Sequence, residues 1–368
     1  MGNTQWLLHI PHAQALRCMN NFFTGEKNKM MKNTILLCLL GCCFFANAQT
    51  STRLAPSRVI SLPGLNTKFD HLAIDETGSR LFVAATTVHA VEVIDLKTDR
   101  IQQNITGLGK PHGLVWVAAT GSLYVADGAL GELRVYKGIP LALAGTIKLS
   151  EDADDMVYDE ALRLLFVGHG TGDAAAPARI AVIDTRRFHL LANLSLATHP
   201  EALEIDPASQ RIFVNVAESN EVAVIDAKTK TIRAHWKLTK AADNVPLAFD
   251  GKDQLLFVAC RKPGMLIALD AATGKEVASA TAASGADDLF YDSSLSRVYL
   301  ISGTGEVDAF QVDGAKSLQS LGALPTAAGA KTALFVPAQN LLYLAVPGAV
   351  DSSSEIKVYV TLKNGNSQ

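Results

Sequence analysis

Short apolar runs alternate with polar turns along most of this chain, and one arrangement of them recurs seven times. An apolar run of strand length ends at an anchor residue, a turn rich in Asp, Gly or Ser follows, and a second run ends in Phe-Val, Tyr-Val or Tyr-Leu. The first copy covers residues 71–84. The seven anchors are Asp75, Val117, Asp159, Asp206, Asp250, Asp292 and Val336, spaced 42 to 47 residues apart. Repetition at a fixed period indicates a repeat architecture.

Each copy continues with a third apolar run, which ends in Asp in several copies, and all copies but the last have a weaker fourth run. The third-run aspartates are Asp95, Asp184, Asp226 and Asp270. We interpret them as part of the scaffold, because an Asp at a turn accepts hydrogen bonds from backbone amides two residues on. Four short strands in each unit of about 43 residues predict an all-β, seven-bladed β-propeller with four antiparallel strands per blade. The blades are expected to start near residues 69, 111, 153, 200, 245, 287 and 331.

The two ends of the repeat region predict how the ring closes. The last copy lacks a fourth strand, and the segment 58–62 before the first copy resembles the fourth strands of the other copies. Pairing of this N-terminal strand with the last blade would close the ring and remove an exposed sheet edge. Residues 49–368 are therefore expected to form a single propeller domain.

Particular residues of the repeat carry a family resemblance. Val93-Ile94-Asp95 is followed by Lys97-Thr98, Val224-Ile225-Asp226 is followed by Lys228-Thr229, and Pro111-His112-Gly113 opens an inner strand. These features are similar to the repeat of YncE-like, YVTN-type seven-bladed propellers, over about residues 58–362. The resemblance implies the fold and an exported bacterial protein, and it implies no one activity.

The first 48 residues are expected to be a leader. Residues 30–48 have a basic start, an apolar run over residues 35–45 and the sequence Ala46-Asn47-Ala48, which is the pattern of a secretory signal peptide. Residues 1–29 are expected to be a start-site extension. The prediction is a periplasmic or secreted protein cleaved near Ala48, and the alternative is a lipoprotein anchored at Cys42. The apolar run is shorter than the ~20 residues that span a bilayer, so no transmembrane helix is expected.

Composition and charge exclude several classes of protein. An apolar content of 48% excludes a disordered chain, and a net charge of −3 argues against a nucleic-acid binder, which needs a basic face. Four of the five cysteines lie in the first 43 residues, so the predicted domain keeps only Cys260, interpreted as a packed small apolar group. The motifs for covalent haem, for pyrroloquinoline quinone (PQQ) and for nucleotide phosphates are missing, so none of these cofactors is expected.

Candidate site residues lie just before the inner strands. Positions four and five before each anchor should begin the inner strand near the central channel, and the loops after the second strand should reach the same face. The ligand-binding candidates at this channel mouth are Asp70, His71, His112, Asp154, Asp155, Glu201, Asp287, Asp288 and Lys331 before inner strands, with Asp127, His169, Glu218 and Arg261 after second strands. Together they predict a polar, mostly acidic opening.

Such an opening suits a cation. The candidate ligands of a divalent metal ion (calcium, zinc or copper) are Asp70, His71, His112 and Asp155. The alternative is that these side chains are simply solvated.

Two functions of different classes stay open. The preferred one is an exported, non-catalytic, monomeric propeller that binds a small molecule, a metal ion or an exported partner protein, and not nucleic acid, at its channel face. The alternative is a metal-dependent hydrolase of the lactonase or esterase type, with Asp154, Glu201 or His169 as its acid or base. The fold by itself does not decide between them.

Overall fold

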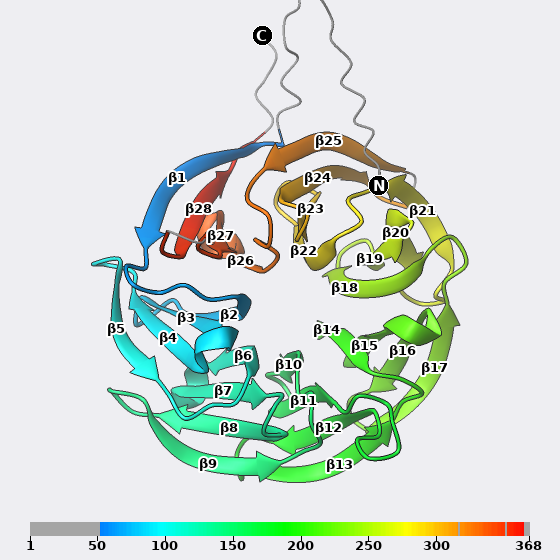
Figure 1. The fold of residues 1–368 in the computed structure, drawn as a ribbon. Helices are drawn as coiled ribbons and strands as arrows, with labels where there is room; N and C mark the ends of the chain where they lie inside the picture. The colour runs from blue at the N-terminus through cyan, green and yellow to red at the C-terminus, as the bar shows by residue number, and fades with distance from the viewer. Residues whose placement is uncertain (1–51, 316, 350–351, 364–368) are drawn as a thin grey trace, which may run out of the picture. The chain divides into compact units, whose positions relative to one another are not determined.

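The fold was analysed in a computed structural model that describes residues 52–315, 317–349 and 352–363. The expected leader lies outside the described residues. Seven four-stranded antiparallel sheets are arranged as blades around a central axis (Figure 1), which confirms the predicted seven-bladed β-propeller. Within the described part of the chain, no helix is long and apolar enough to cross a membrane.

Each blade runs from an inner strand at the axis to an outer strand at the rim. Blade 1 contains β2 (Phe69–Asp75), β3 (Arg80–Ala85), β4 (Ala90–Asp95) and β5 (Arg100–Ile105). Blade 2 contains β6 (Pro111–Val117), β7 (Ser122–Asp127), β8 (Glu132–Lys137) and β9 (Ala142–Lys148). Blade 3 contains β10 (Met156–Asp159), β11 (Leu164–His169), β12 (Arg179–Asp184) and β13 (His189–Ser195). Blade 4 contains β14 (Pro200–Asp206), β15 (Arg211–Val216), β16 (Glu221–Asp226) and β17 (Thr231–Lys237).

The remaining blades follow the same order. Blade 5 contains β18 (Ala242–Asp250), β19 (Leu255–Lys262), β20 (Gly264–Asp270) and β21 (Glu276–Thr281). Blade 6 contains β22 (Ala286–Asp292), β23 (Arg297–Ser302), β24 (Glu306–Asp313) and β25 (Ser317–Pro325). Blade 7 contains β26 (Ala333–Val336), β27 (Leu341–Val346) and β28 (Glu355–Thr361), with β1 (Leu54–Ser61) as its outer strand. Short 3-10 turns lie at η1 (Thr86–Val88), η2 (Ala118–Thr120), η3 (Ala217–Ser219) and η4 (Pro337–Gln339).

The predicted ring closure is confirmed. β1 pairs antiparallel with β28, so the strand that precedes blade 1 completes blade 7. The strand starts at Leu54, four residues before the predicted segment, because the pairing continues past an irregularity between Pro56 and Arg58. Backbone hydrogen bonds from Leu62 to Ser354 (3.0 Å) and from Leu362 to Arg53 (2.7 Å) extend the closure at both ends of the strand.

The core lies between blades rather than within them. Seven apolar clusters of buried residues each join two neighbouring blades. Side chains alternate across a strand, so Leu81 and Val83 of β3 face blade 7 while Phe82 and Ala84 face blade 2. This two-sided burial explains why the second strand of each repeat is apolar at successive positions instead of alternating with polar ones.

The repeated aspartates stabilise turns, as predicted. Asp95 accepts a hydrogen bond from the Lys97 amide (2.7 Å), and Asp184 accepts one from the Arg186 amide (2.9 Å). The anchor Asp75 accepts from the Gly78 amide (2.9 Å) and pairs with Arg80. These carboxylates hold the turns between strands and lie outside the central channel mouth.

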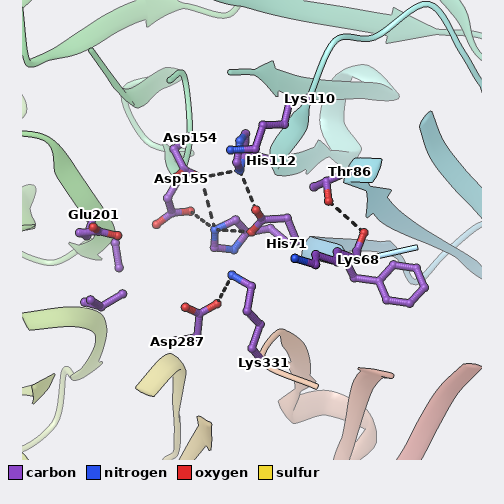
Figure 2. A pocket seen from close by; sticks show the side chains of 14 residues that line it. Lys68, His71, Thr86, Lys110, His112, Asp154, Asp155, Glu201, Asp287 and Lys331 are labelled. Carbon is purple, nitrogen blue, oxygen red and sulfur yellow. Dashed lines mark hydrogen bonds and ion pairs between the residues drawn. The ribbon is translucent and has the colours of Figure 1, made fainter. Parts of the chain in front are cut away.

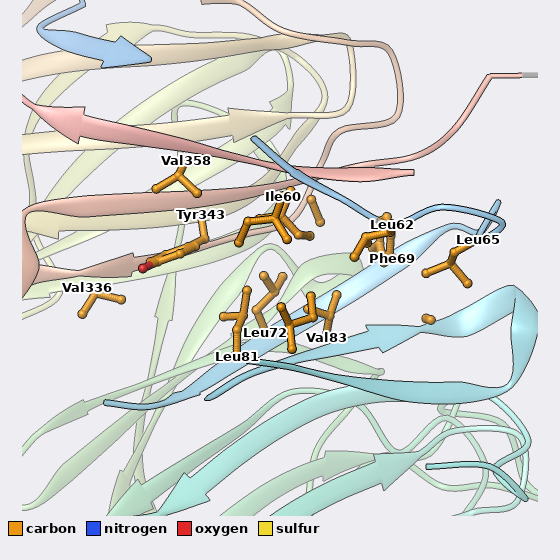
Figure 3. Packing of buried hydrophobic residues seen from close by; sticks show 14 residues of the cluster. Ile60, Leu62, Leu65, Phe69, Leu72, Leu81, Val83, Val336, Tyr343 and Val358 are labelled. Atoms are coloured by element: carbon orange, nitrogen blue, oxygen red, sulfur yellow. The ribbon is translucent and has the colours of Figure 1, made fainter. Parts of the chain in front are cut away.

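Closure predicts a specific stability difference between two adjacent residues of β1. Ile60 is fully buried in the cluster between blades 7 and 1 (Figure 3), whereas Val59 is 51% exposed. Ile60→Ala is expected to lower the free energy of unfolding by about 2–4 kcal/mol because it leaves a cavity. Val59→Ala, the matched control, is expected to change it by less than about 0.5 kcal/mol. Urea unfolding followed by tryptophan fluorescence measures both, and equal losses would contradict the role of β1 in closure.

Candidate functional site

Bulges in four inner strands help to place the side chains at one mouth of the channel. In β2 the pairing with β3 is regular from Leu72 onward but shifts between Phe69 and Leu72, and β6, β14 and β18 have the same irregularity. In β22 the shift is one residue shorter, and β10 and β26 begin only after the corresponding positions. In β2, β6, β14 and β18 the bulge releases the residues four and five before the anchor from the ladder. Bulges of this kind re-aim side chains beside functional sites, and here they turn these residues toward the axis.

Glycine allows two blades to approach at the mouth. A Cβ at Gly113, on β6, would lie 2.3 Å from the backbone oxygen of Asp154. The missing side chain therefore lets blade 3 bring Asp154 beside the residues of blades 1 and 2.

The resulting cavity has a volume of about 340 Å³. Eight of the predicted residues line it (Figure 2). They are Asp70, His71, His112, Asp154, Asp155, Glu201, Asp287 and Lys331. They come from blades 1, 2, 3, 4, 6 and 7, so residues up to 261 positions apart in the sequence converge on one opening.

His71 lies at the centre of a group of carboxylates. Its Nε2 atom lies 3.7 Å from an oxygen of Asp70, 3.9 Å from Asp154 and 4.0 Å from Asp155. Its Nδ1 atom lies 4.0 Å from an oxygen of Asp288. All four distances exceed the usual hydrogen-bond range of about 2.7–3.2 Å. The imidazole is thus surrounded by carboxylate oxygens without being hydrogen-bonded to any of them.

Other contacts hold three of these carboxylates in place. Asp70 accepts a hydrogen bond from Nδ1 of His112 (2.6 Å). Asp155 of blade 3 accepts from the Leu203 amide of blade 4 (2.7 Å), and Asp288 of blade 6 accepts from the Ala333 amide of blade 7 (2.7 Å). For Asp70 and Asp288, the oxygen that faces His71 is the one not used in these bonds.

The crowding shifts the protonation of the group. Burial alone lowers the pKa of His71, but the surrounding carboxylates, led by Asp155, outweigh it and raise the pKa to about 10. Burial also raises the pKa of Asp288 to about 7, against the opposing charge of His71. Burial would raise the pKa of Asp154 too, but the neighbouring His199 and the charges of His112 and His71 hold it well below its usual range. In the absence of another cation, His71 therefore carries a positive charge at the centre of these carboxylates.

On the opposite side of the cavity, Asp287 is paired with two cations. It accepts from Arg261 (2.6 Å) and from Lys331 (2.6 Å), and Arg261 also donates to the backbone oxygen of Ala286 (2.8 Å). Glu201 lines the cavity nearby, and burial raises its pKa to about 7.

Three of the sequence candidates lie away from the cavity. Asp127 is buried and accepts hydrogen bonds from the amides of Gly109 (2.7 Å) and Lys110 (2.9 Å), so it holds the segment before β6. His169 is buried, accepts from the Ser150 amide (3.1 Å) and contacts Asn193 (3.1 Å). Glu218 is exposed on η3. Of the four candidates expected after second strands, only Arg261 donates to a candidate side chain that lines the cavity, that of Asp287.

Three residues that the sequence reading did not single out belong to this mouth. His199 donates from Nδ1 to the Gly170 oxygen (2.9 Å) and places Nε2 3.9 Å from Asp154. Lys68 and Lys110 line the cavity. Each of the three lies seven positions before an anchor, two positions earlier than the candidates chosen from the sequence. The repeat therefore also places these residues at the channel mouth.

Comparisons with known proteins support the fold and no particular activity. No protein-family model matches the chain, and no curated protein matches its sequence. One chain of the crystal structure of a mitotic checkpoint complex superposes with a TM-score of 0.70 at 16% identity, over 84% of this chain and 92% of that one. Hydrazine synthase from Kuenenia stuttgartiensis superposes with a TM-score of 0.68 at 16% identity, over 78% of this chain and 97% of that one. At this identity the likeness shows a seven-bladed propeller fold alone, and membership of the YncE-like family stays a resemblance.

The pKa shifts predict how the stability of the metal-free protein depends on pH. His71 and His199 have folded-state pKa values of about 10 and about 9, above the unfolded value of about 6.5. The folded state therefore binds more protons between pH 6.5 and 10, and stability must fall as the pH rises through that window. Thermal melts in EDTA are expected to show this decline, and His71→Asn is expected to flatten it. A melting temperature that rises from pH 6.5 to 10 would contradict these pKa shifts.

Proposed function

We propose that this propeller binds a divalent transition-metal ion at its channel mouth, through Asp70, His71 and Asp154. One observation carries the proposal: His71 is surrounded by carboxylate oxygens that are too far for hydrogen bonds and close enough to share an ion. One oxygen each of Asp70 and Asp154 and one nitrogen of His71 lie within 4.8 Å of one another.

The distances suit an ion of the size of zinc. Zinc lies about 2.1 Å from nitrogen and oxygen ligands, so tetrahedral ligand atoms are about 3.4 Å apart. The separations of 3.7–4.0 Å between Nε2 of His71 and the three carboxylate oxygens come within about half an ångström of that value. Calcium is less well suited, because it takes 6–8 oxygen ligands and an imidazole nitrogen faces the centre of this group.

His112 has a different part in this proposal from the one expected from the sequence. Its Nδ1 is bonded to Asp70, and its Nε2 is buried and has no hydrogen-bond partner. The ring also packs on Gly128, where a Cβ would come within 2.8 Å of it. His112 therefore orients the Asp70 carboxylate instead of ligating the same ion, as outer residues commonly do around metal sites. Asp154 takes its place among the proposed ligands.

The alternative hydrolase would need a base beside the ion. Glu201 lines the same cavity and, with a pKa of about 7, has the acidity of such a group. Since no feature of the described residues selects a scissile bond, binding is the function proposed.

Metal binding is tested by titrating EDTA-dialysed, untagged protein with Zn²⁺ in a calorimeter. One ion per chain is expected, with affinity rising with pH because the ion displaces a proton from His71. Asp154→Asn is expected to abolish measurable binding, and His112→Ala to weaken it about 10–100-fold. Glu218→Gln, an acidic residue at the same end but outside the cavity, serves as the matched control. Absence of binding by zinc, manganese and copper, or equal affinity for Asp154→Asn and the control, would refute the proposal.

We also propose that the chain is exported, on the support of the signal-peptide pattern in residues 30–48. Expression of the full chain in a Gram-negative host is expected to give periplasmic protein that starts at Gln49. N-terminal sequencing of the periplasmic fraction measures this. Mature protein that retains the apolar run in the cytoplasm would contradict export, and a lipid-modified Cys42 would replace soluble release with anchoring.

A further inference from the structure

The lysine and arginine side chains around the channel-mouth cavity fall into two groups, those paired with a carboxylate and those with no such partner among the described residues. Arg261 and Lys331 are both paired with Asp287, at 2.6 Å each. Lys68 and Lys110, from blades 1 and 2, line the same cavity and have no ion-pair partner among the described residues. Among the residues that line the cavity, the lysines without an ion-pair partner are therefore Lys68 and Lys110, which lie beside His71 and His112 in Figure 2.

The backbone holds both lysines at equivalent places. Lys68 donates its amide to the Thr87 hydroxyl (3.1 Å), and its oxygen accepts from the Thr86 amide (2.9 Å). Lys110 donates its amide to the buried Asp127 (2.9 Å). Each lysine stands two residues before a member of the central group, Asp70 or His112.

We propose that the cavity binds a small carboxylate or phosphate anion, with one oxygen on the metal ion and the others on Lys68 and Lys110. This inference rests on the proposed function. Three ligands from the protein leave an open position on the ion, as in zinc sites that accept an exogenous group. Carboxylate and phosphate oxygens would fill that position and also accept charge-assisted hydrogen bonds from ammonium groups.

Size and charge limit the ligand further. A volume of about 340 Å³ is at the small end of the range for ligand pockets, so a compact anion fits better than a large one. The remaining walls are acidic or already paired, through Glu201 and Asp287. A long polyanion would meet these carboxylates, whereas a compact one reaches only the ion and the two lysines.

The experiment uses the zinc-loaded full chain and two probes, oxalate and inorganic phosphate, titrated separately by calorimetry. Binding of at least one probe to the zinc-loaded protein is expected, with little binding after EDTA dialysis, and the preferred probe distinguishes carboxylate from phosphate. Lys68→Ala/Lys110→Ala is expected to weaken anion binding by at least about tenfold. Zinc binding should be retained or strengthened in that variant, because two positive charges near the ion are removed. Lys68→Arg/Lys110→Arg should retain anion binding, and Lys137→Ala, an exposed lysine outside the cavity, is the matched control.

The outcomes separate the two proposals. If zinc binds and neither probe does, or if the double alanine variant binds the anion as tightly as Lys137→Ala, this inference is overturned and the metal site stands. If an anion binds equally well with and without zinc, coordination to the ion is overturned. If zinc itself does not bind, the proposed function fails, and this inference fails with it.

Discussion

Pairing of β1 with β28 is the interaction on which the rest of this structure depends. Every blade buries both of its faces against neighbours, so a ring with one gap would expose two apolar faces and a sheet edge. The closing strand brings Ile60 and Leu62 into the cluster between the first and last blades. Closure also fixes the distance between blade 1, which carries His71, and blade 7, whose Ala333 amide holds Asp288.

The same closure lets the protein keep several carboxylates close together. Repulsion among Asp70, Asp154, Asp155 and Asp288 would drive a flexible group apart, but rigid blades hold them. His112 or backbone amides also bond one oxygen each of Asp70, Asp155 and Asp288. His71 supplies the compensating charge, and this is why its pKa lies far above the usual value for histidine. The proposed metal ion would therefore compete with a proton for the His71 imidazole, and this competition makes the proposed binding depend on pH.

The site was predictable from the sequence only where the repeat frame constrains it. Residues four and five before the anchors lie at the channel mouth because they lie near or just before the start of each inner strand, and four of these strands bulge there. Residues in the loops after the second strand are not constrained in this way. His169 turns into a hydrogen bond with Asn193, Asp127 holds a backbone segment, and Glu218 faces outward. Conversely, His199, Lys68 and Lys110 occupy an equivalent position in their repeats, seven residues before the anchor, but the strand pattern did not mark that position.

The sequence by itself determined the number of blades, the order of strands, the way the ring closes and the turn-forming role of the repeated aspartates. These features follow from local periodicity and turn chemistry, which short segments encode on their own. Only the tertiary structure decided which polar residues meet, because contacts such as His71 with Asp288 join positions more than two hundred residues apart. A difference of a few tenths of an ångström decides whether two polar atoms share a hydrogen bond or are spaced to bind the same ion. The packing of the seven rigid sheets sets the distances between these atoms.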